Sequence, residues 1–251
     1  MKSSAEVKVS CEFLEIYCDE LRDLFYTLDH KGDRKALEKD NRPKLDVGLT
    51  REKRVVVKGI VEKFVSGPEE MIKLFNDANG GRVVHATSMN KESSRSHSVF
   101  TIKTENYNKT TKKTDHGKLC IIDLAGSERV KKSEVVGTQF EEAVAINKSL
   151  SALGDVIKAL SAPKRADGKE EFVNYRNNIL TRVMQDSLGG TAKTLMFINA
   201  SPSGWNADET RGTLEYGSRV KDIKNVVGKA TDSAEVNDLK KEIEALKKQI
   251  K

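Results

Sequence analysis

The chain has 251 residues, 37% of them hydrophobic and 33% charged, and a formal net charge of +6. This composition is typical of a soluble protein with one substantial domain or two small ones. No apolar run approaches the roughly 20 residues of a membrane-spanning helix, the first residues lack the apolar stretch of a secretory signal, and the three cysteines form no paired framework or metal-binding spacing. We therefore expect a protein of a reducing, intracellular compartment, whose positive charge favours nucleic acid, an anionic membrane or an acidic protein as partner.

The first part of the chain predicts one strand and one clear helix. Apolar residues alternate with polar ones over 7–17, which predicts a strand with one buried face. Residues 19–25 are predicted to form a short helical turn, and the polar stretch 27–54 an extended surface connection. A helix is expected over 66–79, because a Ser-Gly-Pro-Glu-Glu start places acidic groups in its first turn and Gly80-Gly81 should stop it.

The second part alternates strands and helices. Predicted elements are a strand at 97–106, a hairpin loop at 106–118, a strand buried on both faces at 119–122, a helix at 139–160, a helix at 177–188, a buried strand at 194–199 and a helix at 206–222. This alternation favours an α/β fold, with a central, mainly parallel β-sheet flanked by helices.

The composition changes after Asn225. Residues 226–233 are predicted to be a linker, and residues 234–251 a short amphipathic helix. Its apolar residues fall at spacings of three and four, at Val236, Leu239, Ile243, Leu246 and Ile250. This pattern covers barely two heptads, so a dimerising coiled coil and a single helix laid on the rest of the protein both stay open.

Two polar segments suggest phosphate chemistry. The strand at 119–122 leads into Asp123-Leu-Ala-Gly126, where a carboxylate can hold Mg²⁺ and a glycine N–H can reach a phosphate that no side chain blocks. Upstream, Asn90–His97 reads Asn-Lys-Glu-Ser-Ser-Arg-Ser-His, in which hydroxyls suit Mg²⁺ and the arginine suits a carboxylate or phosphate. Each segment alone is equally typical of an ordinary loop. The informative feature is that both occur in one chain, separated by a single hairpin.

Together these segments resemble the kinesin motor family. The family's first switch, Asn-x-x-Ser-Ser-Arg-Ser-His, is matched by Asn90–His97, and its second, Asp-Leu-Ala-Gly-Ser-Glu, by Asp123–Glu128. Further similar segments lie at 146–154 (resembling the main microtubule-facing helix), 175–182, 185–190 and 218–225. The resemblance covers roughly residues 6–225 and implies the P-loop NTPase-like motor fold. The wording of 193–199 leans towards the minus-end-directed, C-terminal-motor group.

The resemblance implies ATP and Mg²⁺ as cofactors and gives each switch residue a role. Ser94 would ligate Mg²⁺, Ser93 would help to place the attacking water, and Asp123 would hold the metal through water. Gly126 would sense the γ-phosphate, and Asn90 would belong to the nucleotide site. Arg95 and Glu128 would form the salt bridge that closes the two switches and links the phosphate state to movement of helix 139–160.

The resemblance also implies a basic face for the acidic surface of the microtubule. The residues in segments that the family presents to the filament are Lys148, Tyr175, Arg176 and Arg182. A second contact is expected from Arg51, Lys53, Arg54 and Lys58. If these charges act together, binding should weaken as salt rises.

One expected part of a motor is missing from the sequence. The phosphate-binding loop Gly-x-x-x-x-Gly-Lys-Ser/Thr does not occur, so residues 1–225 are expected to be the C-terminal two-thirds of a motor domain, incomplete at the N-terminus. Without that loop we expect no appreciable ATP hydrolysis by the chain alone. It would be either a truncated piece of an ordinary motor or a chain that begins at Met1 and has lost its ATPase activity, and the intact switches favour the first.

Three functions are compared on this basis. The leading one is an ATP-driven motor on cytoplasmic microtubules, with the spindle as one candidate location. The second is a nucleotide-independent microtubule-binding module that acts with a partner through residues 234–251. Nucleic-acid binding rests on the basic charge alone, because the sequence has no aromatic platform or reader motif.

Overall fold

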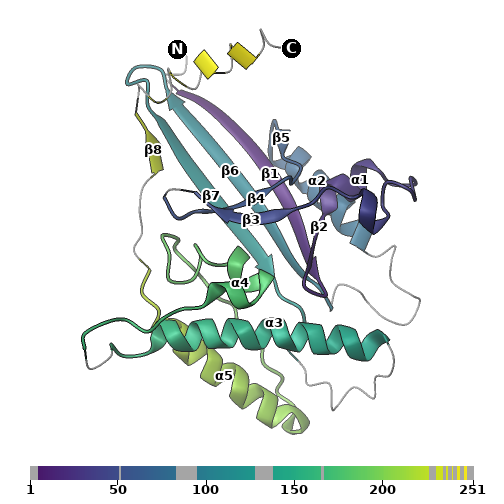
Figure 1. Ribbon diagram of the computed structural model, residues 1–251, viewed down its shortest axis with the longest axis vertical. Coiled ribbons are helices and arrows are strands. Elements are labelled where there is room, and N and C mark those ends of the chain that lie inside the picture. Colours follow the sequence, from purple (N-terminus) through teal and green to yellow (C-terminus); the bar gives the residue numbers. More distant parts are fainter. Residues whose placement is uncertain are drawn as a thin grey trace.

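The computed structural model describes residues 5–50, 52–82, 95–127, 138–164, 167–225 and 230–233, together with 236, 239, 242–243 and 246–247. Three long strands lie side by side, and a long helix crosses one end of them (Figure 1). Within these described ranges, no helix combines the length and apolar character required to cross a bilayer.

The main sheet is built from β1 (Ala5–Tyr17), β2 (Glu20–Asp23), β5 (Lys63–Val65), β6 (His97–Asn108), β7 (Thr114–Asp123) and β8 (Ala230–Asp232). Its order is β2-β1-β6-β7-β8, and β5 also pairs with β1. A second, two-stranded sheet joins β3 (Asp46–Leu49) to β4 (Val55–Lys58). The mainly parallel sheet expected from the sequence is not found among these strands, since every described pair is antiparallel. The short turns after β1 and β6 account for the β1–β2 and β6–β7 pairs, because a tight turn can join only antiparallel neighbours.

The helices are α1 (Leu24–Asp29), α2 (Pro68–Arg82), α3 (Thr138–Ser161), α4 (Ile179–Val183) and α5 (Ala207–Lys221). Short 3₁₀ turns are η1 (Lys39–Asn41), η5 (Tyr175–Asn177) and η6 (Gly204–Asn206). In Figure 1, α1 and α2 lie together beside the sheet, whereas α3, α4 and α5 gather at the end of the sheet where β6 begins and β7 ends. Strands and helices therefore both contribute, as the predicted α/β class requires.

The sheet buries both faces of β1. Cys11 and Phe13 point into a core shared with α1 and α2, in which Phe13 stacks on Phe75 with ring centroids 5.1 Å apart. Leu14 and Ile16 point the other way, into a core shared with α3, α4 and the β3–β4 hairpin. Successive side chains of a strand face opposite sides, so one strand serves two cores. The sequence predicted one buried face for this strand, and this prediction is wrong because both faces are buried.

Several predicted elements have different bounds. Residues 19–25 form β2 and the start of α1, with Asp23 capping the helix by accepting from the N–H of Phe25 at 2.9 Å. Helix α2 continues through Gly80 and Gly81, because its last residue, Arg82, is held by buried partners. The expected connection 27–54 includes η1 and β3, and the expected hairpin loop is shorter because β7 already begins at Thr114. Helix α4 is shorter than the predicted 177–188.

Two predicted buried strands are not buried as expected. In β7, Leu119 and Ile121 are 56% and 54% exposed, while the alternate residues pack in the core, so only one face is covered. Residues 194–199 form no strand, and Leu195 and Phe197 are 77% and 80% exposed. In the described part of the chain no strand pairs with this segment, and an apolar run without a pairing partner has no ladder to join.

Part of the predicted linker forms a strand. Residues 226–229 lie outside the described residues, but β8 falls within the expected 226–233 and pairs with Thr114–His116 of β7. The described positions beyond it are helical, and four of their apolar residues are exposed, Val236, Leu239, Ile243 and Leu246.

Candidate functional site

The two polar segments singled out in the sequence meet at the α3 end of the sheet (Figure 1). Ser98 of β6 lies opposite Asp123 of β7 in the antiparallel register. One step beyond this pair, the N–H of Ala125 donates to Nδ1 of His97 at 3.0 Å. The predicted closeness of the segments is thus seen for their described parts, 95–98 and 123–127.

His97 forms hydrogen bonds through both ring nitrogens at this junction. It is 3% exposed, and its Nε2 lies 2.7 Å from the hydroxyl of Ser149 on α3. Burial lowers the pKa of His97 to about 4, so the imidazole is neutral at physiological pH. Sequence analysis placed this residue only at the end of a motif and gave it no role.

In the described part of the chain, Arg95 is bonded to α3. Its Nη1 donates to Oε2 of Glu142 on α3 at 2.7 Å. The other carboxylate oxygen of Glu142 accepts from the hydroxyl of Tyr17 at 2.6 Å. Glu128, the expected partner, lies outside the described residues. Glu142 was missed because no motif connects it with Arg95 in the sequence.

A buried ion pair fixes the segment next to Arg95. Nε of Arg82 lies 3.2 Å from Oε1 of Glu15, and both side chains are 4% exposed. Ser96 donates to the same carboxylate oxygen at 2.7 Å and accepts from Nη2 of Arg82 at 2.9 Å. The chain just before β6 is therefore held by α2 and β1, which positions Arg95 and His97 towards α3.

The nucleotide-side residues are described only in part. Asn90, Ser93 and Ser94 lie outside the described residues. Asp123 is exposed at the end of β7, and Gly126 is half-buried in the loop that follows. Within the described ranges no three His, Cys, Asp or Glu side chains gather to hold a metal. An exposed carboxylate suits Mg²⁺, which usually keeps several waters and takes phosphate oxygens.

The predicted basic residues fall on neighbouring elements. Lys148 is exposed on α3 and Arg176 is exposed in η5. Arg182 of α4 is half-buried and donates to the carbonyl of Val47 in β3. Tyr175 is turned inward, because its hydroxyl donates to the carbonyl of Leu188 at 2.6 Å and burial raises its pKa to about 12. Its side chain therefore supports the loop that presents Arg176.

The second basic group lies in the β3–β4 hairpin. Lys53 and Lys58 are exposed on it, Arg54 is half-buried, and Arg51 lies outside the described residues. Asp186, which follows α4 in the chain, holds this hairpin in place: its Oδ2 accepts from the N–H of Val55 at 3.0 Å.

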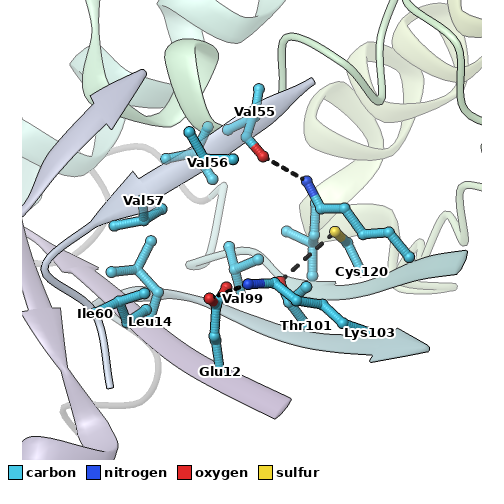
Figure 2. Close-up of a pocket in the computed structure, with 13 residues that line it drawn as sticks. Glu12, Leu14, Val55, Val56, Val57, Ile60, Val99, Thr101, Lys103 and Cys120 are labelled. Carbon is cyan, nitrogen blue, oxygen red and sulfur yellow. Dashed lines mark hydrogen bonds and ion pairs between the residues drawn. The ribbon is translucent and has the colours of Figure 1, made fainter. Parts of the chain in front are cut away.

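A pocket lies between this hairpin and the sheet (Figure 2). Its wall is mostly apolar, with Val55, Val57 and Ile60 on one side and Val99 on the other. Its polar groups are already paired: the Lys118 amine bonds the Val55 carbonyl and Asp186, and Lys103 pairs with Glu12. We therefore read this pocket as part of the packing that holds the hairpin, and place the functional site at the junction with α3.

Comparison with known proteins identifies relatives over nearly the whole chain. The family model described as Kinesin motor domain matches residues 1–223. The kinesin heavy chain of Doryteuthis pealeii is 44% identical over 227 residues, which is 90% of this chain and 22% of that protein. This chain therefore spans about a fifth of the length of such relatives.

Solved structures show the same likeness. A fast kinesin structure has 41% identity and a TM-score of 0.74, covering 92% of this chain and 60% of that one. A KIF14 dimer, in a two-heads-bound state with AMP-PNP and a microtubule, has 33% identity and a TM-score of 0.77, covering 90% and 61%. These similarities confirm the family and the fold that the two switch motifs predicted, whereas the C-terminal-motor group stays a prediction.

Proposed function

Because this chain belongs to the kinesin motor domain family, we propose that it is part of a microtubule motor in which ATP hydrolysis is coupled to filament binding and movement. The observation that carries the proposal is the junction at α3. There, Arg95 and His97 of the first switch are bonded to the helix that carries the exposed Lys148. A change at the phosphate side would then reach the filament side through one helix.

Each switch residue has a chemical task in this proposal. ATP and Mg²⁺ would supply the phosphoryl group and the charge that stabilises its transfer. Ser94 would ligate the metal, Ser93 would help to place the attacking water, and Asp123 would hold the metal through water. Asn90 and Gly126 would contact the nucleotide, with the glycine N–H facing the γ-phosphate. Arg95 and Glu128 would pair when the switches close.

The filament face would consist of charges on three adjacent elements. These are Lys148 on α3, Arg176 and Arg182 around α4, and Arg51, Lys53, Arg54 and Lys58 of the hairpin, with Tyr175 supporting the loop. Their proximity is supported by the shared core of α3, α4 and the hairpin. Exposed cations spread over one face would recognise an acidic surface mainly by long-range attraction, which salt screens.

We further propose that this chain on its own binds ATP poorly. The sequence contains no Gly-x-x-x-x-Gly-Lys-Ser/Thr, so it lacks the backbone N–H groups and the lysine that grip the β- and γ-phosphates. Filament binding by the isolated chain would then be independent of nucleotide. The alternative function, a nucleotide-independent microtubule-binding module, predicts the same for the chain in every context.

Co-sedimentation with microtubules tests the filament proposal. We expect binding that is unaffected by ATP, weakens with added salt and falls several-fold in Lys148→Ala, because each lost cation removes attraction to the acidic filament. Lys158→Ala is the matched control, since Lys158 is an exposed lysine in the last turn of the same helix. Release by ATP would contradict the proposed nucleotide deficiency, and absence of binding by folded protein would contradict the filament face.

Dimerisation and location form a separate proposal. Val236, Leu239, Ile243 and Leu246 are exposed at helical positions, so a second copy could bury them in a short coiled coil. We propose that the chain acts on cytoplasmic microtubules, those of the spindle included. Sedimentation velocity of wild type and of Leu239→Asp would test the dimer: a monomeric wild type contradicts it.

A further inference from the structure

At α3 a buried hydrogen-bonded chain joins the two switch segments through His97, a residue to which the sequence motifs gave no role. It runs from the loop after β7, through the His97 ring, to α3. Its members are almost fully enclosed, with exposures of 5% for Ala125, 3% for His97 and 5% for Ser149. Three separate elements are therefore bonded through one side chain.

The donors and acceptors in this chain admit only one arrangement. A backbone N–H can only donate, so Nδ1 of His97 accepts from Ala125, 3.0 Å away. The neutral ring then carries its proton on Nε2, which donates to the Ser149 hydroxyl at 2.7 Å. Ser149 in turn donates to the carbonyl of Ile146 at 2.7 Å, within α3. The ring is thus satisfied on both nitrogens without a charged partner.

A second contact joins the same segment to the same helix. Arg95 lies two residues before His97, and Glu142, its partner, lies seven residues before Ser149. Seven residues are about two helical turns, so both contacts lie on one side of α3. The segment leading into β6 is therefore joined to the helix at two points, and His97 also holds the loop after β7 through the N–H of Ala125.

We propose that His97 is a positioning residue, which as the Nε2–H tautomer fixes the loop Leu124–Ser127 on α3 and so makes filament contact at α3 felt at Gly126. The free-state part of this inference stands on the geometry alone, and the filament part rests on the proposed function. A buried ring bonded at both nitrogens transmits displacement in both directions, because a shift of Ser149 must move the ring or break one bond.

Two substitutions separate the two bonds. In His97→Asn the amide oxygen takes the place of Nδ1, so the bond from Ala125 is kept and the bond to Ser149 is lost. In His97→Gln the longer side chain can reach Ser149, and the acceptor for Ala125 is lost. Ser149→Ala removes the other end of the chain, and Ser151→Ala makes the same change at an exposed position of α3.

The free protein is measured first. Nitrogen NMR of wild type should show His97 neutral with its proton on Nε2. Exchange of the Ala125 amide with deuterium should be about tenfold faster in His97→Gln than in wild type, and little changed in His97→Asn and Ser151→Ala. A proton on Nδ1, or equal exchange of Ala125 in wild type and His97→Gln, overturns the inference.

The filament-bound protein is measured second. Microtubules should slow exchange of the Gly126 amide in wild type and in Ser151→Ala, and should do so much less in His97→Asn and Ser149→Ala, which have lost the link to α3. Equal slowing in all four would overturn the coupling. If wild type binds no microtubules, the filament proposal and the coupling fail together, while the free-state measurements still decide whether His97 holds the loop.

Discussion

At the residue scale, the buried imidazole of His97 makes stability depend on pH. Its pKa is about 4 in the folded protein, against about 6.5 when the chain is unfolded. Above pH 6.5 both states are neutral; below it the unfolded state binds the proton more readily, so stability falls between pH 6.5 and 4. The full difference corresponds to about 3 kcal/mol in the free energy of unfolding.

We therefore expect the free energy of unfolding, measured in urea, to fall more between pH 7 and pH 4.5 for wild type than for His97→Asn. Comparing the two proteins cancels the groups common to both, including Glu12 and Asp23, whose pKa values burial raises. If the two pH profiles run parallel, the ring is not buried as a neutral group.

Also at the residue scale, Glu15 is expected to be a stability determinant. Its carboxylate receives Arg82 and Ser96 in an interior where both charges are 4% exposed. Glu15→Gln leaves the guanidinium buried without its counter-charge, which should cost about 3 kcal/mol in the free energy of unfolding. Replacing both Glu15 and Arg82 by leucine should cost less than Glu15→Gln alone. Glu20→Gln, at an exposed ion pair with Lys39, is the control and should change little.

At the element scale, Asp186 should determine whether the β3–β4 hairpin stays docked. It accepts from the Val55 N–H and from Lys118, at 3.0 and 2.9 Å. Asp186→Ala leaves the buried Val55 N–H without an acceptor and the Lys118 amine without its counter-charge, and should cost about 2 kcal/mol. Amide exchange should rise in 46–58 more than in α3. Asp155→Ala, at an exposed position of α3, provides the comparison, and uniform exchange after Asp186→Ala would contradict this role of Asp186.

The elements also show what periodicity in the sequence predicts well. Strand β1 and helices α3 and α5 lie close to their predicted bounds, because their apolar residues repeat with the period of a strand or of a helix. Prediction failed where a partner distant in sequence decides the outcome. Arg82 carries α2 through two glycines, and residues 194–199 have strand-like composition but no described strand beside them.

The site divides in the same way. The closeness of 95–98 and 123–127 followed from two motifs joined by one hairpin, and the structure has it. Glu142 and Ser149 were not predicted as partners of this junction, because a helix side chain 47 or 52 residues away carries no local signal of the contact. The motifs predict the chemistry of the site, whereas the packing of α3 on the sheet determines which side chains contact one another there.

At the scale of the whole molecule, the open side of β7 should govern solution behaviour. Strand β8 pairs only with Thr114–His116, and no other described strand pairs with β7 beyond β6, so the remainder of its outer edge is available to another chain. Leu119 and Ile121 are more than half exposed on the same strand. An unpaired edge with exposed apolar side chains is a template for strand addition.

We therefore expect concentration-dependent self-association, measurable by sedimentation velocity and light scattering, and stronger at high salt because the net charge of +6 then repels less. Ile121→Lys should shift the protein towards monomer at a given concentration, with little change in the unfolding midpoint because the side chain is exposed. Phe172→Lys removes an apolar side chain that is 77% exposed in a loop and belongs to no described strand. If both substitutions reduce association equally, nonspecific hydrophobic association is responsible. If only Ile121→Lys reduces it, association proceeds through β7. A protein that is monomeric at all concentrations would show that this edge is protected in solution.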